Sequence, residues 1–154
     1  MKQPSQYFRA GVGAVIVNDR CLVLALERSD VPGAWQFPQG GLEQDEEPAS
    51  AVRREIREET GISADSLELI DEYPEPLAYE LPTSDRNEKT GRGQVQYWFL
   101  FRFTGPDGAI DLPARGEFKA WRWMLMGEVL ANVAMFRRRV YQLLAARFSE
   151  HVSP

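Results

Sequence analysis

The chain has 154 residues, a formal net charge of -5, 44% hydrophobic residues and 27% charged residues, which suits one folded domain over residues 1–154. The acidic balance excludes strong non-specific binding to long nucleic acid, because such binding depends on cationic side chains that neutralise phosphates. Cys21 is the single cysteine, so an intrachain disulfide is excluded and a reducing, cytoplasmic location is expected. The sequence shows no signal-peptide pattern and no apolar run near the ~20 residues of a membrane span, so no membrane association is expected.

In chain order, two apolar runs come first, at residues 11–17 and 21–27, and a polar turn separates them. This pattern predicts a β-hairpin. A short extended piece is expected at residues 35–37, and the following Pro-Gln-Gly-Gly stretch at 38–41 predicts a turn.

A helix is predicted from about Glu47 to Thr60. Pro48 suits the first helical turn, where its missing N–H is not needed, and Gly61 is a good stop signal.

The second half of the chain predicts more strands and a terminal helix. The polar, glycine-bearing stretch 82–93 predicts a mobile loop. Strands are expected at residues 67–73, 77–81, 94–104 and 118–124, and a helix from about 128 to 148. The fold class is therefore α+β, a mixed sheet with one substantial helix in mid-chain and one at the end.

The mid-chain helix carries an unusual distribution of acids. At 100° per residue, Glu55, Glu58 and Glu59 fall on one side, with Glu59 beside the apolar stripe of Val52 and Ile56. A solvated charged face is the ordinary alternative, but it favours opposite charges four residues apart, whereas Glu55 and Glu59 are alike. Burying an unpaired carboxylate is also costly. A divalent cation removes both objections, and oxygen ligands suit Mg²⁺ or Mn²⁺.

Residues 40–62 resemble the Nudix box, a motif of glycine and glutamate positions at fixed spacing. Its defined positions are filled by Gly40, Glu46, Arg54, Glu55, Ile56, Glu58, Glu59, Gly61 and Ile62. The resemblance implies the Nudix fold, a mixed curved β-sheet sandwiched between α-helices, and a hydrolase that cuts phosphoanhydride bonds.

Further stretches resemble the bacterial RNA pyrophosphohydrolases and the related dinucleoside polyphosphate hydrolases. They are YFR at 7–9, WQFPQGG at 35–41, GQVQYWF at 93–99, EF at 117–118 with WRW at 121–123, and FR at 136–137 with VY at 140–141. The resemblance implies one of two reactions, removal of pyrophosphate from the 5′-triphosphate end of RNA or asymmetric cleavage of diadenosine tetraphosphate. Hydrolysis of ADP-ribose or a nucleoside triphosphate remains an alternative, as does a non-catalytic Nudix-fold module that binds nucleotides or RNA.

The resemblance also assigns roles around the metal. Glu55, Glu58, Glu59 and Glu117 are expected to bind Mg²⁺ or Mn²⁺, with the carbonyl of Gly40 as a further ligand. Catalytic roles are expected for Glu55, Glu58 and Glu117. Glu55 is the preferred general base and Glu117 the alternative, since a metal-bound water needs only a modest base.

Other motif positions are expected to support these groups. Arg54 is expected to orient a glutamate through an ion pair, Glu46 to act structurally at the helix start, and Gly61 to end the helix.

Substrate contacts are expected from arginine, aromatic and glutamine side chains. They are Arg9, Arg28, Tyr79, Gln96, Phe136 and Arg137. Arginine suits phosphate oxygens because its fork binds two at once, although each of the three can equally be an exposed arginine. Tyr79 and Phe136 are able to stack on a base or to belong to the core.

Overall fold

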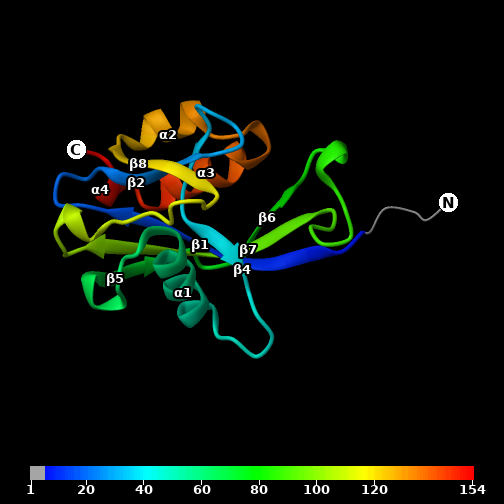
Figure 1. Ribbon diagram of the computed structural model, residues 1–154, viewed down its shortest axis with the longest axis horizontal. Helices are drawn as coiled ribbons and strands as arrows, with labels where there is room; N and C mark the ends of the chain where they lie inside the picture. Colours follow the sequence, from blue (N-terminus) through cyan, green and yellow to red (C-terminus); the bar gives the residue numbers. More distant parts are fainter. Residues whose placement is uncertain (1–5) are drawn as a thin grey trace.

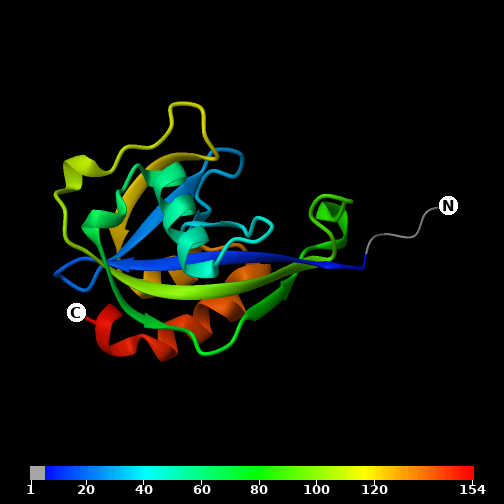
Figure 2. The same cartoon turned by 90° about the horizontal axis from the view of Figure 1, so that it is seen from below.

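The computed structural model describes residues 6–154, in which one mixed β-sheet lies between helices on both of its faces (Figure 1 and Figure 2). The first five residues of the sequence, which the signal-peptide expectation included, lie outside this range. The strands are β1 (Phe8–Val17), β2 (Val23–Arg28), β3 (Trp35–Gln36), β4 (Gln39–Gly41), β5 (Leu67–Glu72), β6 (Leu77–Glu80), β7 (Gly93–Phe103) and β8 (Phe118–Met124). The α-helices are α1 (Pro48–Thr60), α2 (Met126–Asn132), α3 (Met135–Arg147) and α4 (Ser149–Val152). None of the helices in residues 6–154 is long and apolar enough to span a bilayer.

The sheet is built on two long parallel strands, β1 and β7, whose register runs from Phe8 opposite Gly93 to Val17 opposite Arg102. Strand order is β3-β2-β1-β7-β5, while β4 pairs with β1, β6 with β7 and β8 with β2. The expected hairpin between β1 and β2 is paired only next to its turn, where Val17 lies opposite Val23. Beyond that pair, β2 separates from β1 and pairs along its length with β8.

The sheet is buried on both faces, and β1 contributes to two cores. Val15 and Val17 belong to the core under α3, whereas Val12, Ala14 and Ile16 belong to the core under α1. Figure 2 shows α1 on one side of β1 and β7 and α3 on the other. Burial on both faces explains why this strand is an almost continuous apolar run rather than an alternating one.

Helix α1 begins and ends close to its predicted bounds. Pro48 occupies the first turn, and Val52 and Ile56 are buried on the face toward the sheet. Gly61 follows the helix with a left-handed φ of 75°, and its N–H donates to the carbonyl of Arg57 at 2.9 Å. The expected mixed sheet between α-helices is thus present, with the glutamate-bearing helix against one face of the sheet.

The expected single helix over residues 128–148 is wrong, because the chain leaves helical conformation between α2 and α3. Val133 and Ala134 have extended backbones, with ψ of 152° and 138°. The side-chain amide of Asn132 donates to the carbonyl of Glu128 at 2.7 Å and so competes with the next helical turn. Val133 is buried in the core under α3, which holds the break in place.

Two stretches expected to lack regular structure contain short ordered elements. The expected turn at 38–41 includes β4, which pairs antiparallel with β1. The expected loop at 82–93 includes a 3₁₀ turn at Thr83–Asp85 and the first residue of β7. Its predicted mobility stays a prediction.

Replacing Gly61 by Ala should lower the free energy of unfolding by about 1–2 kcal/mol, because a side chain in the left-handed region is strained. A Cβ there would also meet the carbonyl oxygen of Asp111 at 3.0 Å. Urea unfolding measures the change. Gly127→Ala in α2 is the matched control, since its Cβ would meet open space, and it should stabilise the fold by about 0.5 kcal/mol. Equal effects of the two substitutions on the free energy of unfolding would contradict the left-handed conformation of Gly61.

Candidate active site

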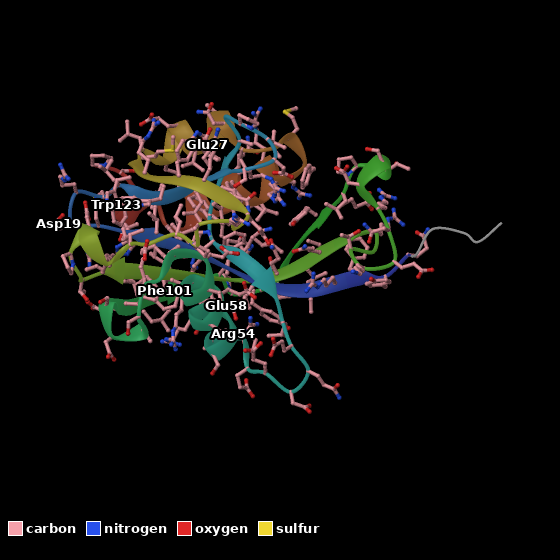
Figure 3. All side chains as sticks on the ribbon, viewed as in Figure 1. Asp19, Glu27, Arg54, Glu58, Phe101 and Trp123 are labelled. Carbon is pink, nitrogen blue, oxygen red and sulfur yellow. The ribbon has the colours of Figure 1, made fainter. Side chains whose placement is uncertain are left out.

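An acidic cavity of about 210 Å³ lies between α1 and the start of β8. Glu55, Glu58 and Glu59 line it from α1, and Glu117 lines it from the residue before β8. The structure therefore brings together all four glutamates that the sequence nominated, although Glu117 is far from the others along the chain. Figure 3 shows Glu58 beside Arg54 on α1.

The four carboxylates repel one another. Burial raises the pKa of Glu59 well above its ordinary value, and the charges of Glu117 and Glu55 raise it further, against one hydrogen bond from the Gln39 N–H at 3.3 Å. Burial also raises the pKa of Glu55, and this rise is opposed by its contact with Arg54. Such a cluster is costly unless protons or a cation balance its charge.

The donor set fits a hard divalent cation. All four side chains offer carboxylate oxygens, which suit Mg²⁺ or Mn²⁺. Within residues 6–154, no three His, Cys, Asp or Glu side chains are already arranged so that they could hold a metal ion. Mg²⁺ keeps several waters and is commonly bound by few carboxylates together with substrate phosphates.

Arg54 is the centre of the hydrogen-bond network behind the cavity. Its Nε and Nη2 donate to the Glu46 carboxylate at 2.8 and 2.9 Å, and Nη2 also donates to the Gly41 carbonyl at 3.0 Å. Its Nη1 donates to Oε1 of Glu55 at 2.8 Å and lies 3.3 Å from Oε2 of Glu58. The guanidinium lowers the pKa of Glu46. Arg54 thus forms ion pairs with Glu55 and with Glu46, which lies just before α1, and its expected role in orienting a glutamate stays a prediction.

Glycines at the end of β4 allow this close approach. A Cβ on Gly40 would lie 1.9 Å from Cδ of Glu55, so any side chain there would displace the carboxylate. A Cβ on Gly41 would lie 2.1 Å from Nη2 of Arg9, so the guanidinium of Arg9, a candidate phosphate ligand, lies directly against Gly41. The Gly40 carbonyl, expected as a further metal ligand, faces Gly11 of β1.

A second cavity, of about 310 Å³, collects three more of the predicted residues. Arg28, Phe136 and Arg137 line it, together with Asp30 and Asp85. The break between α2 and α3 delivers Phe136 and Arg137 to this cavity, which the expected continuous helix would not have explained.

Arg137 is a nearly buried cation, 7% exposed. Its guanidinium packs on the rings of Phe136 and Tyr79, at 4.6 and 5.6 Å from their centroids. Arg137 Nε and the Tyr79 hydroxyl have no hydrogen-bond partner within the described residues. Tyr79 and Phe136 also line a third cavity, so Phe136 forms a wall between two cavities. Both aromatic rings are packed, and Tyr79 belongs to the core under α3.

Gln96 is completely buried and links the strands behind the acidic cavity. Its Nε2 donates to Oε1 of Gln39 at 3.2 Å and to Oε1 of Gln94 at 3.1 Å, while its own Oε1 is unpaired in the described residues. Because Gln39 also donates its N–H to Glu59, this network reaches the acidic cavity. The sequence analysis did not select Gln39 or Gln94 as site residues. Their positions in the motif stretches WQFPQGG and GQVQYWF were the only signal that could have identified them.

Another residue that the sequence did not single out for the site is Tyr141 of α3. Its hydroxyl oxygen accepts the N–H of Phe37 at 2.9 Å, and the two rings stack at 4.5 Å between centroids. Burial raises the pKa of the Tyr141 hydroxyl. This contact fixes the strand that leads into β4, and thereby the position of Gly40.

A model of the NUDIX domain matches residues 7–144. The chain belongs to the Nudix family. The Nudix relatives include the RNA pyrophosphohydrolase of Cereibacter sphaeroides, 38% identical over 151 residues that cover 95% of this chain and 93% of that protein. The RNA pyrophosphohydrolase of Acidiphilium cryptum is 42% identical over 151 residues, which cover 92% and 90% of the two chains. The chloroplastic Nudix hydrolase 26 of Arabidopsis thaliana is 36% identical over 99% of this chain and 74% of its own.

Solved Nudix structures share the fold. The dihydroneopterin triphosphate pyrophosphohydrolase of E. coli superposes with a TM-score of 0.73 at 23% identity, covering 92% of this chain and 99% of its own. A C. elegans Ap4A hydrolase complex superposes with a TM-score of 0.71 at 21% identity, covering 92% and 98%. The expected Nudix fold and hydrolase family are therefore confirmed.

Replacing Gly40 by Ala should reduce kcat/KM by roughly 100-fold, because displacing a catalytic group by about 1 Å has an effect of that size. The added Cβ would force the Glu55 carboxylate out of its position. Steady-state kinetics and thermal denaturation together measure the change. Gly108→Ala is the control, since its Cβ would meet nothing within 4 Å. Unchanged kcat/KM in Gly40→Ala would show that this close approach is not required.

Replacing Glu59 by Gln should stabilise the metal-free protein, and increasingly so as the pH rises. The pKa of Glu59 is raised in the folded state above its ordinary 4.5. Between those two values the unfolded chain loses its proton first, so wild-type stability falls as the pH rises through this window. Thermal denaturation from about pH 5 to about pH 8 compares the two proteins.

Mg²⁺ should reverse the difference at the upper end of that range, because wild type offers four carboxylates to the ion and the variant only three. Glu68→Gln, which changes an exposed residue of β5, is the control. A stability difference between wild type and Glu59→Gln that does not vary with pH would contradict the buried-charge explanation.

Proposed function

We propose that this protein is a Mg²⁺-dependent hydrolase that removes pyrophosphate from the 5′-triphosphate end of RNA. The carrying observation is the convergence of Glu55, Glu58, Glu59 and Glu117 on one cavity. The choice of RNA is supported by relatives named RNA pyrophosphohydrolase that match over at least nine-tenths of both chains. The acidic surface is compatible with this choice, because an enzyme that reads only a 5′ end needs few phosphate contacts.

The four glutamates would hold Mg²⁺, or Mn²⁺ in its place, with the Gly40 carbonyl as a further ligand. A bound divalent ion would neutralise charge on the phosphate oxygens and orient a water molecule. Glu58 and Glu117 would act in catalysis from this position.

Glu55 is the proposed general base. Arg54 holds Oε1 of Glu55, which leaves Oε2 to accept the proton of the attacking water. Burial raises the pKa of this carboxylate, which makes it a better proton acceptor than an exposed glutamate. Water attacks a phosphorus, and the phosphoanhydride bond opposite the water breaks.

The nucleotide end is proposed to occupy the second cavity. The nearly buried charge of Arg137 has no carboxylate partner within the described residues, so a substrate phosphate would balance it. Phe136 offers an aromatic wall for a base. Arg9, which is exposed on β1, would contact the polyphosphate chain, and the buried Gln96 and Tyr79 would support the binding site from β7 and β6.

Incubation with triphosphorylated RNA should yield monophosphorylated RNA and pyrophosphate, with either Mg²⁺ or Mn²⁺. A parallel panel of diadenosine tetraphosphate, ADP-ribose and nucleoside triphosphates, with products identified by mass, ranks the alternatives. Faster turnover of diadenosine tetraphosphate than of RNA would overturn the choice of substrate. No turnover of any polyphosphate would overturn the enzyme assignment.

Glu58→Gln is the site-directed arm of the same experiment. It should lower kcat by roughly 100-fold, the usual effect of removing one group that stabilises transition-state charge. Glu47→Gln removes the same charge from an exposed residue at the α1 boundary, outside the acidic cavity, and should retain activity. Full activity in Glu58→Gln would contradict the site.

A further inference from the structure

The guanidinium of Arg28 in the second cavity is already engaged by a carboxylate of the same chain. Its Nε donates to Oδ1 of Asp30 at 2.8 Å and its Nη2 donates to Oδ2 at 2.9 Å, a bidentate pair. Its Nη1 donates to Oε1 of the buried Gln36 at 3.2 Å. Three of the five N–H donors of Arg28 are therefore used, and its charge is balanced.

Arg137 lines the same cavity in the opposite condition. Arg137 contacts aromatic rings and has no ion pair with a carboxylate within residues 6–154. The cavity thus contains one arginine whose charge is neutralised and one whose charge is not. A phosphate entering it would gain most by binding Arg137, and near Arg28 it would meet the negative charge of Asp30.

The ion pair between Arg28 and Asp30 is partly exposed, so it contributes little to the free energy of folding. The side chain of Asp30 is 64% exposed and that of Arg28 is 25% exposed. Ion pairs at such positions contribute little to the free energy of folding, because water screens them. Both side chains line the cavity, where a bound ligand would meet the charge of the pair.

We infer that Asp30 determines the specificity of the second cavity by neutralising Arg28. Asp30 acts as an internal anion that keeps phosphate away from Arg28, so that this side of the cavity accepts an uncharged part of the substrate. The apolar residues Val31, Ala34 and Leu81 line the same cavity and suit such a group. Arg137 is then the cation that receives phosphate. This inference rests on the proposed function, because it assigns the cavity to the nucleotide end of the substrate.

The test measures binding rather than turnover. Two probes are titrated by calorimetry in the presence of Mg²⁺. One is inorganic tripolyphosphate with its bridging oxygens replaced by NH, and the other is a dinucleotide whose 5′-triphosphate is modified in the same way. Asp30→Asn should bind the inorganic probe at least about threefold more tightly, because Arg28 regains an unbalanced charge at a partly exposed position. The preference for the dinucleotide over the inorganic probe should fall accordingly.

Asp85→Asn is the matched control, since Asp85 lines the same cavity and loses the same charge but does not bind Arg28. Equal tightening in both variants would overturn the inference, because it would show only a general change in field. No tightening in Asp30→Asn would overturn it as well.

Arg28→Gln provides a second measurement that does not depend on the Asp30 variant. Arg28→Gln in the otherwise unchanged protein should leave the affinity for the inorganic probe within about twofold, since its charge is already balanced. A large loss of that affinity would identify Arg28 as a phosphate ligand and overturn the inference. Because both probes resist hydrolysis, these results are independent of whether RNA proves to be the substrate.

Discussion

The site depends on one arginine, Arg54, which bonds one backbone carbonyl and the carboxylates of three glutamates. Its guanidinium bonds the Gly41 carbonyl after β4, the Glu46 carboxylate before α1, and the Glu55 and Glu58 carboxylates within α1. Without that positive charge, the acids on α1 would face only one another. The arginine therefore makes an assembly of like charges tolerable in the folded chain while leaving the cavity-facing oxygens free to bind a cation.

Predicted site residues line two cavities of different electrostatic character. The first is lined by four carboxylates, and the second is lined by two arginines, two aspartates and apolar side chains, among them Phe136. The break between α2 and α3 supplies the second cavity, whereas α1 supplies the first. Because different elements build the two cavities, substitutions in the second cavity are able to leave the four glutamates in place.

Local patterns predicted most of the fold. The bounds of α1 follow from Pro48, Gly61 and a 3.6-residue apolar period, and the structure places this helix within one residue of its predicted start. The aromatic run at residues 94–104 likewise became β7 with a shift of one residue. Strand β1 begins at Phe8, before the apolar run that predicted it. Its first three residues are exposed, and they belong to the sheet because they pair with β7.

What could not be predicted depends on partners distant in sequence or on competing local bonds. At the end of α2 the side-chain amide of Asn132 donates to the carbonyl of Glu128, and the residue type alone does not reveal this contact. The contact between Tyr141 and Phe37 joins residues more than a hundred positions apart. Arg28 was predicted as a phosphate candidate from its residue type, whereas its actual engagement with Asp30 depends on how the chain turns after β2.

The parallel pairing of β1 with β7 also has a consequence for how the molecule forms. The first strand of the described chain has to wait for residues 93–103 before it gains its longest neighbour, and Glu117 and Phe136 come later still. Contacts between such distant segments must overcome a large loss of chain entropy, and proteins rich in them fold slowly. During synthesis on the ribosome, β1 is therefore made long before β7, and the four glutamates of the acidic cavity come together only after Glu117 has emerged.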